Sequence, residues 1–183
     1  SLNYDKSGSK GFYVTQRADP TATETYGGRY VFSELRQRSL NASLRADLAL
    51  SPRLSIQWYA QPYIATGDYE GFKELARPRS FDFLRYGKDG SSTLALDEGA
   101  GTYSADPDGV GPAPAIRFRN PDFSFRSLRS NLVARWEYRP GSTVFLVWNH
   151  GRAGSSTDPT AGLFEETGAE LSGEVTLSVE RDG

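Results

Sequence analysis

The stretch Ser39–Ile64, SLNASLRADLALSPRLSIQWYAQPYI, decides the fold of this chain. On both sides of Ser51-Pro52-Arg53, apolar residues alternate with mostly polar ones. A period of two is typical of a β-strand that has one apolar face. With Ser51-Pro52-Arg53 as a three-residue loop, the apolar faces of the two arms coincide, as strand pairing requires. The expected pairs are Leu50 with Leu54, Leu48 with Ile56, and Ala46 with Trp58.

A second stretch repeats this pattern 88 residues later along the chain. Ser127–Arg139 and Thr143–His150 alternate in the same way around Pro140-Gly141-Ser142. With those three residues as the loop, the expected pairs are Trp136 with Leu146 and Ala134 with Trp148. Two hairpins built by the same rule predict a single antiparallel sheet.

Composition favours a membrane β-barrel. Hydrophobic residues make up only 37% of the 183 residues, whereas aromatic residues reach 13%. A barrel with a polar lumen and aromatic girdles gives both values. The net charge of −2 gives no reason to expect nucleic acid as a partner, and the absence of cysteine excludes disulfides and thiol chemistry. No cofactor is expected. The chain has no apolar run long enough for a membrane-spanning helix and no signal peptide, so we expect a processed or partial chain.

The rest of the chain predicts further strands separated by long loops. Short turns that alternate with long excursions are typical of outer-membrane barrels. We expect one domain over residues 1–183, with long loops at about 67–123 and 151–168. A short helix at Tyr69–Ala76 would end before Pro78. The expected further strands are Phe12–Gln16, Arg29–Arg38, Phe81–Arg85 and Glu170–Glu180.

These patterns predict an all-β fold, an antiparallel meander that forms a transmembrane-type β-barrel or a segment of one. The alternative is a soluble β-sandwich or lipocalin-like barrel that binds a carbohydrate or an apolar ligand. Alternation alone does not distinguish them, because an apolar strand face can contact either lipid or a protein core.

The same strands resemble the C-terminal region of the bacterial DUF5916 family over about residues 29–150. The resemblance implies an outer-membrane β-barrel component without an established catalytic motif, in contact with outer-membrane lipid. Its partners would be other subunits or the missing part of its own barrel. Family members carry an upstream β-sandwich that is absent here, and this chain does not end on an aromatic residue as they do. The resemblance is carried by Arg29–Phe32, Leu54–Tyr63, Gly67–Tyr69, Asn120–Phe123, Ser127–Asn131, Arg135–Thr143 and Phe145–Trp148.

Candidate site residues lie on the polar faces of the predicted strands. In a barrel, the charged ones would form ion pairs or an arginine-lined constriction in the lumen. The others form a polar and aromatic ladder that could hold a sugar by stacking and amide hydrogen bonds. A solvated, purely structural face is the alternative for both sets. The charged candidates are Arg45, Arg129, Arg135 and Glu137, and the ladder is Gln57, Tyr59, Gln61 and Tyr63.

The sequence offers weak metal and catalytic signals. Asp106 and Asp108, with the nearby Asp97-Glu98, have oxygen ligands that calcium prefers, but a turn is the favoured interpretation. His150 is the only histidine, and no catalytic triad can be built around it. We therefore expect no enzyme, and a barrel component whose role would be transport or surface assembly.

Overall fold

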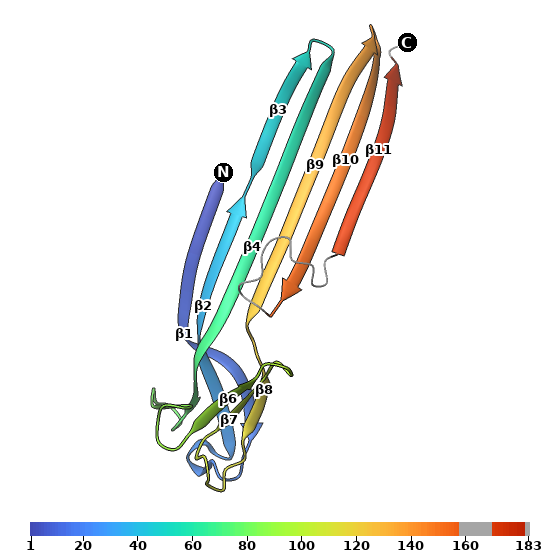
Figure 1. The fold of residues 1–183 in the computed structure, drawn as a ribbon. Coiled ribbons are helices and arrows are strands. Elements are labelled where there is room, and N and C mark those ends of the chain that lie inside the picture. The colour runs from blue at the N-terminus through green and yellow to red at the C-terminus, as the bar shows by residue number, and fades with distance from the viewer. Residues whose placement is uncertain (158–169, 182–183) are drawn as a thin grey trace. The chain divides into compact units, whose positions relative to one another are not determined.

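The computed structural model describes residues 1–157 and 170–181, which lie mostly in antiparallel β-strands (Figure 1). A short 3₁₀ turn, Thr23–Thr25, lies between the first two strands. The strands are β1 (Leu2–Ala18), β2 (Gly28–Ala42), β3 (Leu44–Ser51), β4 (Leu54–Leu75), β5 (Phe83–Arg85), β6 (Thr93–Asp97), β7 (Thr102–Asp106), β8 (Ile116–Arg119), β9 (Phe123–Arg139), β10 (Ser142–Ser156) and β11 (Glu170–Arg181).

The larger sheet is an open meander. Its order is β1-β2-β4-β9-β10-β11, with β3 and β5 also paired to β4, and a smaller sheet has the order β6-β7-β8. The described strands do not close into a ring. The predicted all-β antiparallel meander is confirmed, in the form of an open segment.

The chain divides into two compact units. The first, here called the hairpin unit, comprises Ser1–Asp5, Arg38–Thr66 and Phe123–Gly183. The second, here called the core unit, comprises Lys6–Gln37 and Gly67–Asp122.

In the hairpin unit, β3 and β4 pair in the predicted register. Leu48 lies opposite Ile56, and Ala46 lies opposite Trp58. The turn is tighter than predicted, because Ser51 lies opposite Leu54 and only two residues remain between them. The register shift omits Leu50, as in a β-bulge, so the expected Leu50–Leu54 pair is wrong.

The β9–β10 hairpin lies two residues away from the predicted register. Trp136 is opposite Val144, and Ala134 is opposite Leu146. The turn is Pro140-Gly141 without Ser142, and Gly141 has a φ of 73°. A type II turn needs such a positive φ at the residue after its proline. Because the displacement is even, every side chain keeps its predicted face.

One face of the hairpin unit is apolar and exposed. The registers align Trp136 with Val144 and Val179, and Leu132 with Trp148 and Val175. Trp136 is 53% exposed and Leu177 is 66% exposed, values typical of side chains without a covering layer. We call this the apolar face, and its exposed large members are Leu44, Leu48, Trp58, Trp136, Leu146, Trp148, Val175, Leu177 and Val179. The alternate residues form the polar face.

The core unit has a true hydrophobic core. Val31 from β2 and Phe72 from β4 pack with residues from β7 and β8. The small sheet β6-β7-β8 lies within the tract 87–121, which the sequence predicted to be a loop. That prediction is wrong in this part, because alternating apolar residues of the tract turn inward. The buried cluster is Val31, Phe72, Tyr86, Ala105, Ile116 and Phe118.

The predicted helix at Tyr69–Ala76 is also wrong, because β4 continues to Leu75. Phe72 and Glu74 are buried while their neighbours are more exposed, which is the period of a strand rather than a helix. The predicted strands Phe12–Gln16, Arg29–Arg38 and Glu170–Glu180 are confirmed within β1, β2 and β11, and Phe81–Arg85 is confirmed only in its last three residues, as β5. The predicted loop at 151–168 is shorter at its start, since β10 runs to Ser156. Its residues 158–169 lie outside the described chain.

Candidate functional site

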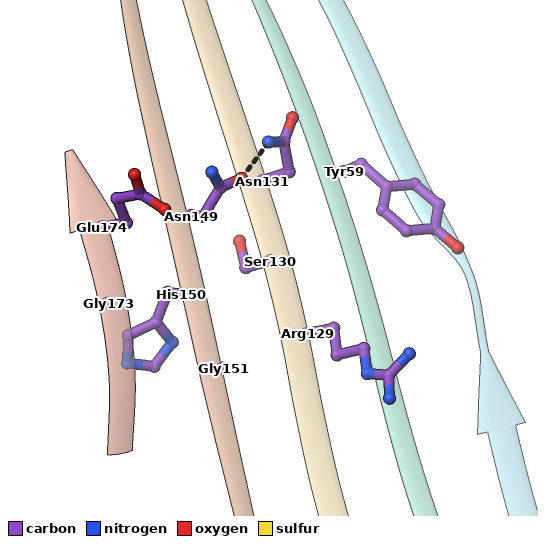
Figure 2. A pocket seen from close by; sticks show the side chains of 9 residues that line it. All are labelled: Tyr59, Arg129, Ser130, Asn131, Asn149, His150, Gly151, Gly173 and Glu174. Atoms are coloured by element: carbon purple, nitrogen blue, oxygen red, sulfur yellow. Dashed lines mark hydrogen bonds between the residues drawn. The ribbon is translucent and has the colours of Figure 1, made fainter. Parts of the chain in front are cut away.

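A hollow of about 610 Å³ opens on the polar face of the hairpin unit. Figure 2 shows its side chains, which come from β4, β9, β10 and β11. Its lining residues are Tyr59, Arg129, Ser130, Asn131, Asn149, His150, Gly151, Gly173 and Glu174.

Strand register explains why the hollow is polar. Asn131, Asn149 and Glu174 lie opposite one another on three successive strands. In the next row on the same face, Arg129 lies opposite Gly151. Because glycine has no side chain, this position leaves space between its neighbours. Asn131, Asn149 and Glu174 therefore lie beside a position on the sheet surface that carries no side chain, that of Gly151.

Two amides at the centre of the hollow hold each other. Asn131 Nδ2 donates a hydrogen bond to Asn149 Oδ1 (Figure 2). Asn131 Oδ1 and Asn149 Nδ2 have no hydrogen-bond partner recorded among the described residues. Tyr59, which is 39% exposed, lies to one side of this pair and Glu174 to the other. The arrangement offers donors, acceptors and one aromatic ring to a ligand.

The structure brings two of the eight candidate residues into this hollow, Tyr59 and Arg129. Three more from the ladder, Gln57, Gln61 and Tyr63, belong to β4 but do not line it. Tyr63 instead packs near Phe125, with ring centroids 6.1 Å apart.

The remaining candidates have local contacts. Arg45 forms an exposed ion pair with Asp47 at 3.2 Å. Glu137 accepts a hydrogen bond from the Gly141 amide at 3.3 Å, which places this carboxylate at the hairpin turn. Arg135 lies opposite Phe145 and does not line the hollow.

The other seven lining residues were not among the candidate binding residues: Ser130, Asn131, Asn149, His150, Gly151, Gly173 and Glu174. Alternation along β10 indicated the polar face for Asn149, but only the register shows which residues of neighbouring strands lie opposite one another. The predicted register of β9 and β10 was displaced by two residues, so it could not identify the Asn131–Asn149 pair.

The core unit contains a second polar cluster, which is buried. Arg29 Nε lies 2.5 Å from Asp19 Oδ2, and Arg29 Nη1 lies 2.6 Å from Glu74 Oε1. The Tyr86 hydroxyl donates to Glu74 Oε2 at 2.7 Å, and Thr21 donates to Asp19 through its amide and its hydroxyl. A cavity of about 170 Å³ borders Arg29 and Glu74. Every charge of this cluster is paired, which is what burial of charges requires.

Burial and pairing shift the pKa values of this cluster in different directions. Burial raises the pKa of Glu74 despite its hydrogen bonds from Tyr86 and Arg29. Burial also acts to raise the pKa of Asp19, but hydrogen bonds from Arg29 and Thr21 outweigh it and hold that pKa below its ordinary value. Burial and the neighbouring Glu74 raise the pKa of Tyr86, so its phenol stays a neutral donor.

The carboxylates proposed as calcium ligands instead accept hydrogen bonds from backbone amides in turns. Asp106 Oδ1 accepts hydrogen bonds from the amides of Asp108 and Gly109, at 3.1 and 2.7 Å. Asp108 Oδ2 accepts one from the Ala113 amide at 3.1 Å, and Asp97 Oδ1 accepts one from the Ala100 amide at 3.0 Å. Among the described residues, no group of three or more histidine, aspartate or glutamate side chains could hold a metal ion.

His150 lies within β10 rather than at a strand end. It is opposite Ser130 and Gly173, with its ring 5.5 Å from that of Trp148. Within the described part of the chain, no helix is long and apolar enough to cross a membrane.

Comparison with known proteins gives no relative: no family model, curated protein or solved structure matches this chain.

Proposed function

We propose that this chain forms part of the wall of a bacterial outer-membrane β-barrel, without enzymatic activity. The apolar face of the hairpin unit would contact lipid, and the polar face would line the lumen. One observation carries the proposal: large apolar side chains lie exposed on one face of five strands, and the other face is mostly polar, with Val133, Phe145 and Val147 as apolar members.

The exposed face would be unfavourable in water. Soluble monomers rarely expose contiguous apolar patches larger than a few hundred Å². Each Å² of apolar surface removed from water contributes about 25 cal/mol, so contact with lipid would stabilise this face. Strands of about 9–11 residues span a bilayer, and β10 and β11 have 15 and 12 residues.

The backbone supports the same proposal and adds a condition. Inside a bilayer, each backbone N–H and C=O must be hydrogen bonded. β4, β9 and β10 each have neighbours on both edges, whereas among the described strands β3 is paired only with β4 and β11 only with β10. A wall in lipid therefore requires further strands beside β3 and β11, supplied by another subunit or by the rest of a larger barrel.

The resemblance to the DUF5916 family over residues 29–150 also favours the outer membrane. It suggests no particular cargo, and transport and surface assembly both remain compatible with the proposed wall.

A soluble β-sandwich or lipocalin-like barrel would need a second layer over the apolar face. Among the described residues, Leu48, Trp136 and Leu177 on that face are more than half exposed. The membrane wall is therefore the better-supported proposal.

Tryptophan fluorescence tests it directly. The chain has three tryptophans, Trp58, Trp136 and Trp148, and all lie on the apolar face. After refolding of the full chain into phosphatidylcholine vesicles, lipids with brominated acyl chains should quench the emission strongly and aqueous iodide only weakly. Strong quenching by iodide without quenching by brominated lipid would overturn the proposal, as would a stable monomer without detergent.

A further inference from the structure

We propose that the hollow on the polar face is a binding site for a neutral oligosaccharide. This inference goes beyond the proposed wall and does not depend on it, because the side chains argued to contact the ligand lie on the polar face. Of the other lining residues, Ser130 and His150 belong to the apolar face and are not used here.

The amide pair is the first argument. The bond from Asn131 Nδ2 to Asn149 Oδ1 fixes both side chains and leaves Asn131 Oδ1 and Asn149 Nδ2 available at the two ends of the pair (Figure 2). One free acceptor and one free donor can each bind a sugar hydroxyl, since a hydroxyl can both donate and accept. Because the amides already hold each other, less side-chain entropy is lost when a ligand binds.

Shape is the second argument. Tyr59 offers an exposed ring, against which the apolar C–H face of a sugar ring can pack. Gly151 leaves room beside the amides. From β4 to β11 the hollow crosses three strand intervals, about 14 Å, which suits several linked sugars better than one.

Charge is the third argument. Arg129 and Glu174 border the hollow on different strands, and no ion pair of either is found among the described residues. Together the two side chains add no net charge to the lining, which favours a ligand without net charge. Each can hydrogen bond to hydroxyls.

Calorimetric titration of the full chain tests the site, with maltotriose, cellotriose and chitotriose as probes and the dipeptide glycylglycine as comparator. We expect at least one trisaccharide to bind and glycylglycine not to bind. Asn131→Ala combined with Asn149→Ala should weaken binding about tenfold or more, since each lost hydrogen bond costs about 1 kcal/mol. Tyr59→Ala should weaken it similarly.

The matched control is Gln57→Ala, on the same face of β4 but outside the hollow, which should bind within about twofold of the unaltered chain. The proposal is overturned if no trisaccharide binds, if glycylglycine binds in preference, or if the hollow variants bind like the control. The titration is carried out both in detergent and in vesicles, so that its result does not depend on insertion into lipid. The membrane proposal is tested separately, by the tryptophan quenching measurement.

Discussion

The indole Nε1 of Trp58 in β4 donates a hydrogen bond to Ser130 Oγ in β9 at 2.9 Å. This bond joins the two repeated hairpins on the apolar face. It also satisfies the polar group of Trp58 on a face whose large side chains are mostly apolar. An unpaired N–H would be costly there if the face contacts lipid, because the hydrocarbon region contains no water to bind it.

Removal of this partner should destabilise the sheet. Ser130→Ala is expected to lower the free energy of unfolding by about 1 kcal/mol, since the indole N–H loses its acceptor. Ser55→Ala is the control, on the other face of β4, because the Ser55 side chain makes no hydrogen bond to any described residue. Urea titration of both variants in the same detergent measures the difference. Equal effects of the two substitutions would show that the bond contributes nothing.

The second hairpin turn should depend on its glycine. Gly141 has a φ of 73°, so Gly141→Ala forces an alanine into the left-handed region at a cost of about 1–2 kcal/mol. Ser142→Ala, at the neighbouring position, should change stability by less than about 0.5 kcal/mol. Urea midpoints give both values. An unchanged midpoint for Gly141→Ala would mean that the turn differs from the one described.

The buried cluster of the core unit should make stability depend on pH in two ways. Because Asp19 has a lowered pKa when folded, its contribution is present above its unfolded pKa of about 3.9 and is lost as pH falls through the folded value. Because Glu74 has a raised pKa when folded, its contribution is full below its unfolded pKa of about 4.3 and is lost as pH rises through the folded value.

Thermal unfolding between pH 2 and pH 8 should separate these two contributions. Asp19→Asn should flatten the decline on the acid side, and Glu74→Gln should flatten the decline towards neutral pH. On either side of the pH profile, the titration of one group changes the free energy of unfolding by at most about 1.4 kcal/mol per pH unit. The assignment fails if Asp19→Asn alters only the neutral side, or if neither variant changes the profile.

Charge should be tolerated on one face of β11 and not on the other. Leu177 lies on the apolar face and Thr176 on the polar face, and both are exposed. Leu177→Arg is expected to cost about 2–4 kcal/mol of folding free energy in vesicles, the cost of an arginine near the bilayer midplane. Thr176→Arg should cost much less, because its side chain would face the lumen. Comparable folding yields for the two variants would contradict the assignment of faces.

The sequence predicted which face each strand presents, because alternation depends only on the backbone period. It failed where the outcome depended on turn geometry or on distant packing. Pro52 and Pro140 occupy equivalent positions 88 residues apart, and each begins a two-residue turn. The predicted loop of the second hairpin was one residue too long, which displaced the register by one, and the irregularity between Ser142 and Thr143 displaced it by one more.

The small sheet of the core unit was harder to predict, since its strands β6, β7 and β8 have only four or five residues and are joined by connections that contain glycine and proline. Tyr103, Ala105 and Phe118 alternate with polar residues over only four or five positions, which local pattern does not distinguish from a loop. The Asp19–Arg29–Glu74 cluster joins three segments that no sequence spacing relates.

The central claim, that one face of the hairpin unit contacts lipid, is tested most directly by labelling adjacent residues of β3. The chain contains no cysteine, so Leu48→Cys and Asp47→Cys each introduce a single thiol, on the apolar and polar face respectively. With the full chain in vesicles, a water-soluble maleimide should label Asp47→Cys quickly and Leu48→Cys slowly, and both should react equally after denaturation. Equal, rapid labelling of both thiols in the folded protein would contradict the account.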